Sequence, residues 1–280
     1  MISVLIIARL TFREASRRKI LLAAALFGVL FLGIYALGLS QIQKDLNQQS
    51  RPIAPVFISQ IHNLILMAGL YVVNFLSIAM TVLTSVDTLS GEISSGTIQT
   101  LISKPVRRWE ILLGKWLGFV GMLSLYLTLM AGGVLLVSIF TLGYVPPNPL
   151  YGLGLIWLNL IMLLGVSFLG GTYLSTLANG VLVFGLYGIS FIGGWIEQFG
   201  SFMENQAAIN IGIISSLVLP AEALWKRAAF EMQSPIASAL GNFSPFSSQS
   251  VPSKVMIVYA IVYAFAALAF AIRKFNQRDL

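Results

Sequence analysis

The sequence predicts an all-α, polytopic membrane protein, and three observations lead to this fold class. Hydrophobic residues make up 57% of the 280 residues and charged residues only 10%, whereas soluble proteins average about 45–50% apolar and about 25% charged residues. The mean hydropathy is +0.87. No Asp, Glu, Lys, Arg or His occurs between Trp116 and Ile196. A spanning helix needs about 20 apolar residues, so this stretch alone has room for about three spans.

Uncharged runs of spanning length predict six transmembrane helices in a single transmembrane domain, residues 1–280. The first run follows Arg17, Arg18 and Lys19, and we expect it to be retained as an anchor, because further spans follow its weak signal-peptidase-like end. Turn-rich segments around Pro146 and Asn179 divide the long uncharged stretch. The predicted spans are residues 20–39, 64–86, 113–142, 153–174, 180–195 and 255–272.

The distribution of lysine and arginine predicts the orientation of these spans. Basic residues gather in the segment 1–19, in the connection 87–110 between the second and third spans, and after residue 272. Cytoplasmic flanks carry the excess of basic residues in membrane proteins, so we expect both termini to be cytoplasmic in a multi-pass protein of the cell (plasma or inner) membrane. The net charge of +7 is therefore attributed to topology and not to a nucleic-acid partner.

The region 197–253 before the last span is predicted to be extracytoplasmic. It contains an apolar stretch, residues 207–219, that is too short for a span and is typical of a re-entrant or interfacial segment. A helix is expected to begin at Pro220, with Glu222 near its positively polarised end. The alternative is that residues 207–219 form a seventh span, which would place the basic tail outside.

The first 19 residues are expected to form an interfacial helix on the inner leaflet. Three arginines recur every fourth residue and so share one face of a helix. Arg18 lies four residues after Glu14, with which it can pair. A plain basic flank that only sets the topology is the alternative. The predicted membrane-surface residues are Arg9, Arg13, Arg17, Arg18 and Lys19.

The composition excludes several classes of functional site. The chain has no cysteine and one histidine, so cysteine-based sites and multi-histidine metal sites are excluded. No predicted span has a charge in its interior, which argues against ion-coupled transport and a membrane hydrolase. The phosphate-binding pattern G-x-x-x-x-G-K-[ST] does not occur, so we expect no catalytic residue, metal or cofactor on this chain. Gly114 and Gly118 form a small-xxx-small pair that favours helix packing.

The connection 87–110 holds the richest pattern of the sequence. Gly91 and Gly96 are expected to break helices, and Pro105 is expected to stop a two-turn helix over residues 97–103. The apolar face of this short helix consists of Ile98, Leu101 and Ile102. A short cytoplasmic helix with an apolar face predicts a partner that covers the face, and a loop on the membrane surface is the alternative.

This connection resembles a cytoplasmic motif of the ABC-2 family, the permease subunits of certain ATP-binding-cassette transporters. The motif reads E-x-x-x-G-T, then P-V-x-R, then G-K. Its parts in this chain are Glu92, Gly96 and Thr97, then Pro105, Val106 and Arg108, and last Gly114 and Lys115. The basic segment before the first span and residues 219–225 agree with the family less specifically. The resemblance implies a second permease subunit, an interfacial N-terminal helix and a cytoplasmic ATPase that binds ATP and magnesium.

The sequence is therefore interpreted as the membrane-spanning permease subunit of an ATP-driven transporter, with export as the expected direction. We expect partners of three kinds: the ATPase, a second permease identical or related to this chain, and membrane lipids. An ion-coupled secondary transporter and a non-transporting assembly or sensory subunit are the alternatives. The predicted ATPase-coupling residues are Glu92, Gly96, Thr97, Ile98, Leu101, Ile102, Lys104, Pro105 and Arg108.

Overall fold

The computed structural model describes residues 2–48, 54–96, 106–234 and 250–278. All the regular elements in these ranges are α-helices, which confirms the predicted all-α fold class. Within the same ranges, six helices are long and apolar enough to cross a membrane. They are α2 (Lys19–Gln48), α3 (Pro55–Ser94), α5 (Arg108–Leu142), α6 (Pro149–Gly171), α7 (Thr176–Phe202) and α11 (Lys254–Gln277). Three shorter helices are α1 (Ile2–Ser16), α8 (Gln206–Val218) and α9 (Ala221–Met232).

The spanning helices extend beyond the uncharged runs that predict them. A helix can continue past the membrane on polar residues with good helix propensity, and α2 does so as far as Gln48. The expectation that Gly91 breaks a helix is wrong, because α3 continues through it to Ser94. The Asp87 side chain covers Gly91 so closely that a Cβ there would lie 2.2 Å from Asp87 Oδ1. Gly96 follows the helix end with φ +71°, a left-handed conformation that favours glycine.

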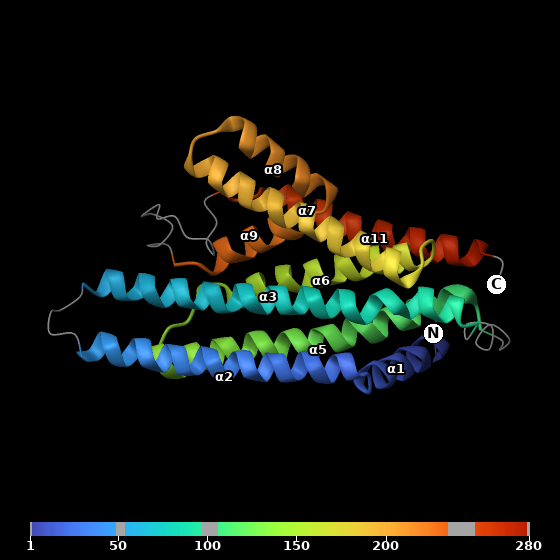
Figure 1. Ribbon diagram of the computed structural model, residues 1–280, viewed down its shortest axis with the longest axis horizontal. Coiled ribbons are helices and arrows are strands. Elements are labelled where there is room, and N and C mark those ends of the chain that lie inside the picture. The colour runs from blue at the N-terminus through green and yellow to red at the C-terminus, as the bar shows by residue number, and fades with distance from the viewer. Residues whose placement is uncertain (1, 49–53, 97–105, 235–249, 279–280) are drawn as a thin grey trace.

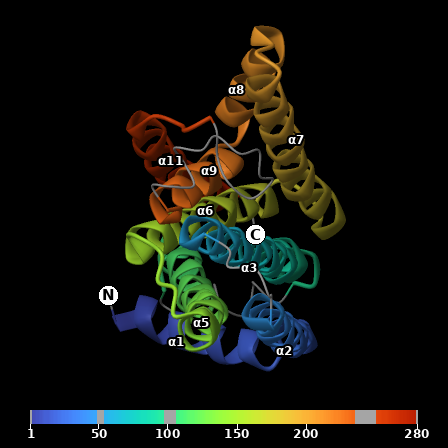
Figure 2. The same ribbon diagram turned by 90° about the vertical axis from the view of Figure 1, so that its left-hand side faces the viewer.

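Helices α3 and α6 form the centre of the bundle. In Figure 2, α3 lies between a layer of α1, α2 and α5 and a layer of α7, α9 and α11. Helix α6 contacts α3, α5, α7, α9 and α11, and most of its side chains are buried. Helix α2 lies at the periphery and buries only Gly28, Tyr35 and Leu39. Leu21, Phe31 and Leu32 are partly buried against the core, and large apolar side chains such as Leu22, Leu26 and Val29 are exposed, as expected where a helix faces lipid.

After α7 the chain folds back as a close helical hairpin and then bends. Helix α8 packs along α7, and glycines permit the contact: a Cβ on Gly193 would lie 1.8 Å from Ser215 Oγ. The chain then bends by 107° into α9. Helix α9 begins directly after Pro220 with Glu222 in its first turn, as the sequence predicts. The predicted re-entrant or interfacial segment 207–219 corresponds to α8, the first arm of this bent pair, and its re-entrant or interfacial placement stays a prediction.

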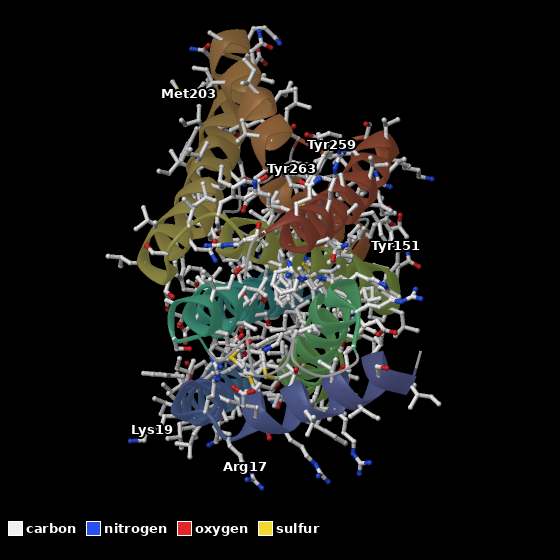
Figure 3. All side chains as sticks on the ribbon, turned by 90° about the vertical axis from the view of Figure 1, so that its right-hand side faces the viewer. Arg17, Lys19, Tyr151, Met203, Tyr259 and Tyr263 are labelled. Carbon is white, nitrogen blue, oxygen red and sulfur yellow. The ribbon has the colours of Figure 1, made fainter. Side chains whose placement is uncertain are left out.

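The basic segments of the chain come together at one end of the bundle (Figure 1). We call this the basic end; it comprises α1, the last turns of α3, the first turns of α5, the α6–α7 turn and the last turns of α11. Arg17 and Lys19 lie at the outer edge of the molecule there (Figure 3). The predicted topology requires these segments to share a side, and that this side is cytoplasmic stays a prediction.

Candidate functional site

Helix α1 is attached to α5 through two glycines. A Cβ on Gly114 would lie 2.7 Å from Ile7 Cβ, and a Cβ on Gly118 would lie 2.7 Å from the carbonyl oxygen of Ala8. Both distances are shorter than the 3.4–4 Å of ordinary contact, so only glycine permits this spacing. The small-xxx-small pair therefore packs helices together, and its partner is the N-terminal helix.

The surface of α1 has three parts. Its buried face comprises Val4, Thr11 and Ala15, which lie toward the bundle. Apolar Leu5, Ile6 and Leu10 are more than half exposed. The predicted basic residues Arg9 and Arg13 of α1 are exposed as well, and so are Arg17 and Lys19, which follow the helix. This arrangement combines attachment to α5 with an apolar and basic outer surface of the kind that contacts lipid. The contact with lipid itself stays a prediction.

An ion pair joins two parts of the family-like motif that lie on different helices. Lys115 Nζ on α5 donates to Glu92 Oε1 on α3, and the exposed fractions of these side chains are 5% and 16%. Thr11, Thr88 and Phe119 surround the pair, which places it where α1, α3 and α5 meet. The pair therefore links the end of α3 directly to α5.

Arg18 and Asp87 extend this network to the neighbouring helices. The guanidinium of Arg18 lies 2.9 Å from Glu14 Oε1, which confirms the predicted pair, and 3.9 Å from Asp87 Oδ2. Thr176 Oγ1, at the start of α7, donates to Asp87 Oδ1 over 3.1 Å. The α1–α2 corner, the end of α3 and the start of α7 are thus held together by polar contacts.

The start of α5 is anchored to the C-terminal residues. The backbone N–H of Arg107 donates to the Glu110 carboxylate over 3.1 Å and so caps the helix. The Arg108 guanidinium donates to the carbonyl oxygen of Arg278. The Arg278 guanidinium donates to the carbonyl oxygen of Thr172 in the α6–α7 turn over 2.6 Å. Arg108 therefore connects α5 with the last residues of the chain.

The structure describes three of the nine predicted coupling residues. Glu92 and Arg108 contact other helices at the basic end, and Gly96 ends α3. The other six lie outside the described residues: Thr97, Ile98, Leu101, Ile102, Lys104 and Pro105. The described parts of the connection 87–110 are thus anchored to the bundle on both sides of residues 97–105.

A second charged cluster lies near the far end of α7, and the sequence analysis does not identify it. Lys226 Nζ on α9 donates to Glu197 Oε2 on α7 over 2.9 Å, and both side chains are less than a tenth exposed. The Ser250 hydroxyl donates to Glu197 Oε1. Helix α7 continues past the predicted span 180–195 to Phe202 and includes Glu197 in its last turns. That these turns are extracytoplasmic stays a prediction.

Glu222 is buried beside this pair. Its backbone N–H donates to Ser190 Oγ of α7 over 3.1 Å, and Gly194 leaves room for its side chain, since a Cβ there would lie 2.1 Å from Glu222 Cγ. The pKa of Glu222 is raised to about 7, because the effect of burial and, less strongly, of the Glu197 carboxylate exceeds the opposing effect of the Lys226 ammonium group. No motif signals this cluster, because its members are brought together only by the return of the chain through α8.

The polar contacts at the basic end thus join α1, α3, α5, α7 and the residues after α11. Among the described residues, no group of three His, Asp or Glu side chains could hold a metal ion. No match was found among curated proteins. The family model described as ABC-2 family transporter protein matches residues 5–280, which is nearly the whole length of the chain. The six apolar helices agree with that match. The chain belongs to the ABC-2 family of transporter proteins, in which it is a transmembrane permease component.

Proposed function

We propose that this permease works in an ATP-driven exporter whose ATPase is a separate cytoplasmic subunit that binds ATP and magnesium. A second permease subunit completes the path, so that cargo crosses between the two. The ATPase docks at the basic end, on the segment Glu92–Arg108. The apolar outer surfaces of α2 and α11 suit a cargo that is itself apolar or amphipathic, because such a compound reaches the protein through the membrane.

The observation that carries this proposal is the ion pair between Glu92 and Lys115. A permease powered by a separate subunit has to convert pressure on a cytoplasmic segment into movement of its spanning helices. Glu92 lies at the start of the proposed docking segment, and its partner belongs to α5. Because Lys115 is almost fully buried, the pair is a rigid link and not a solvated surface contact.

The other end of the segment supports the same proposal. Arg108 is bonded to the carbonyl oxygen of Arg278, and Arg278 is bonded in turn to the α6–α7 turn. A force applied between Glu92 and Arg108 therefore acts on α3 and α5 directly and on α6, α7 and α11 through the tail. This arrangement distributes the force to helices on both sides of the central α3.

The test is to purify the native complex, identify the ATPase that co-purifies with the chain, and measure ATP-driven flux of the two proteins in vesicles. The double variant Ile98→Asp, Leu101→Asp should remain inserted but lose the ATPase, since a buried anchor at such a contact contributes about 1–3 kcal/mol. The matched control Thr100→Asp, Ser103→Asp adds the same charge to the opposite side of the predicted short helix and should keep the ATPase.

Lys115→Met separates binding from coupling. It should leave the ATPase bound and reduce ATP-driven flux, whereas Lys254→Met, an exposed lysine at the far end of the bundle, should change neither. Normal assembly and normal flux in the Ile98→Asp, Leu101→Asp variant would refute docking at this segment. Flux that collapses with an uncoupler while ATP is held constant would favour an ion-coupled transporter instead.

A further inference from the structure

An apolar cavity of about 480 Å³ lies between α6, α7 and α11 in the half of the bundle nearest the basic end. Its walls include Leu169, Leu186 and Ala266, and Tyr263 lies between α11 and α7 (Figure 3). Tyr173 and Phe270, at its rim, are both more than half exposed, so the cavity is open to the surroundings of the bundle. Its volume falls within the roughly 300–1,000 Å³ of pockets that bind small molecules.

The position of this cavity decides what can fill it. All three helices that line it are long and apolar enough to span the membrane, and an opening between such helices is expected to face the bilayer. A water molecule needs two to four polar partners to occupy a cavity, and the walls here are almost entirely apolar side chains. A flexible hydrocarbon chain from the bilayer is the occupant that satisfies both conditions.

A positive charge lies at the rim of the cavity on the side of the basic end. Lys274 Nζ lies 5.0 Å from the centre of the Tyr173 ring, and that ring is part of the cavity wall. Within the described ranges, no carboxylate forms an ion pair with Lys274. Arg273 beside it is exposed. Basic pockets between spanning helices at the cytoplasmic surface bind the head groups of anionic lipids.

We propose that this cavity binds one anionic phospholipid of the surrounding bilayer, with an acyl chain between α6, α7 and α11 and its phosphate at Lys274 and Arg273. The apolar cavity and the cationic rim share one aromatic ring, Tyr173, so a single amphipathic molecule contacts both. The lipid fills a space between α11 and the α6–α7 pair and thereby stabilises the packing of the last spanning helix. This assignment requires only that the chain is inserted in a membrane.

The experiment uses the full-length chain in phosphatidylcholine vesicles that contain a phosphatidylglycerol with a photoreactive group in one acyl chain. After illumination, the attached peptides are identified by mass spectrometry. Attachment should concentrate on the lining segments of α6, α7 and α11, and added phosphatidylglycerol should compete better than phosphatidylcholine. Lys274→Gln should reduce this preference roughly fivefold, the effect of about one basic residue at an anionic surface.

Matched variants on α11 control for position and for charge. Ala266→Trp fills the cavity and should abolish the attachment, whereas Ala269→Trp places the same side chain on the exposed face of the helix and should not. Lys254→Gln removes an equal charge at the opposite end of α11 and should keep the preference. If Ala266→Trp does not insert, the comparison of Lys274→Gln with Lys254→Gln decides alone.

Two results would overturn the proposal. Equal competition by phosphatidylcholine and phosphatidylglycerol, with attachment spread over all spanning helices, would show ordinary boundary lipid. Efficient disulfide formation between two copies of Phe270→Cys in this cysteine-free chain would show that a second copy of the chain covers the opening.

Discussion

The contact between α1 and α5 predicts a large effect from the smallest possible substitution, Gly118→Ala. The added methyl group would lie 2.7 Å from the carbonyl oxygen of Ala8 and 2.8 Å from Thr11 Cβ. The carbonyl belongs to the backbone, so it cannot rotate away. The two helices have to separate by roughly 0.7 Å or more before ordinary contact is restored.

The size of the effect follows from that displacement. A gap of 0.5–1 Å costs about a quarter to a half of the attraction between two packed surfaces, and overfilling a close contact costs about 1–3 kcal/mol. Gly132→Ala is the matched control on the same helix, because nothing lies within 4 Å of its added Cβ. Alanine is favoured over glycine in a helix by up to about 1 kcal/mol, so the two substitutions should change stability in opposite directions.

Two measurements check this prediction. Thermal unfolding of the purified chain in lipid nanodiscs should show a lower midpoint for Gly118→Ala and an equal or higher one for Gly132→Ala. A reporter cysteine, Ala15→Cys, is buried near the helix contact and should react faster with an impermeant thiol reagent only in the Gly118→Ala background. Equal midpoints for both variants, with the reporter protected in both, would refute the steric argument.

Three further predictions concern the far cluster and the topology. Lys226→Met removes the ion-pair partner of the buried Glu197 carboxylate and should lower the free energy of unfolding by about 3–5 kcal/mol. The double variant Lys226→Met, Glu197→Gln should regain most of this stability in an unfolding assay. A double variant as unstable as the single one would contradict the ion pair. Because the pKa of Glu222 is raised, the folded chain keeps a proton between about pH 4 and about pH 7 that the unfolded chain releases. The contribution of Glu222 to the free energy of unfolding is therefore complete below about pH 4 and is lost as the pH rises toward about 7, by about 1.4 kcal/mol per unit of pKa shift. Glu222→Gln should flatten this fall in the thermal midpoint, and an unchanged pH profile would argue against it. A cysteine at Gln277 should be labelled only from the cytoplasm and one at Asn148 only from outside, and the reverse pattern would invert the topology.

The apolar content of the chain predicts the spanning helices well because a membrane imposes one simple requirement, about 20 apolar residues per helix. It does not predict where the helices end, because polar residues can extend a helix beyond the membrane, where no apolar side chains are required. The polar residues at the ends of α2 and α3 do so. Gly91 illustrates the limit: its sequence context suggests a break, but the Asp87 side chain packs over it within a continuous helix.

The candidate site likewise has some features that the sequence predicts and others that only the structure shows. The resemblance identifies Glu92 and Lys115 as parts of one motif, but their ion pair joins residues 23 positions apart on different helices and required the structure. Gly114 and Gly118 indicate a packing surface without indicating that α1 is the helix that covers it. Glu197 and Lys226 are 29 positions apart, and only the α7–α8 hairpin between them brings them together.

The light packing of α2 has a consequence for how the permease can move. Of its 30 residues, only Gly28, Tyr35 and Leu39 are buried, whereas the corner before it is held by the contacts of Arg18 with Glu14 and Asp87. Close contacts of Gly28 with Met130, of Leu32 with Gly133 and of Tyr35 with Gly69 attach the middle of α2 to α5 and α3, so this stretch should move together with those helices. After Leu39 no residue of α2 is buried, and the turns toward Gln48 should therefore be the first part of the helix to open.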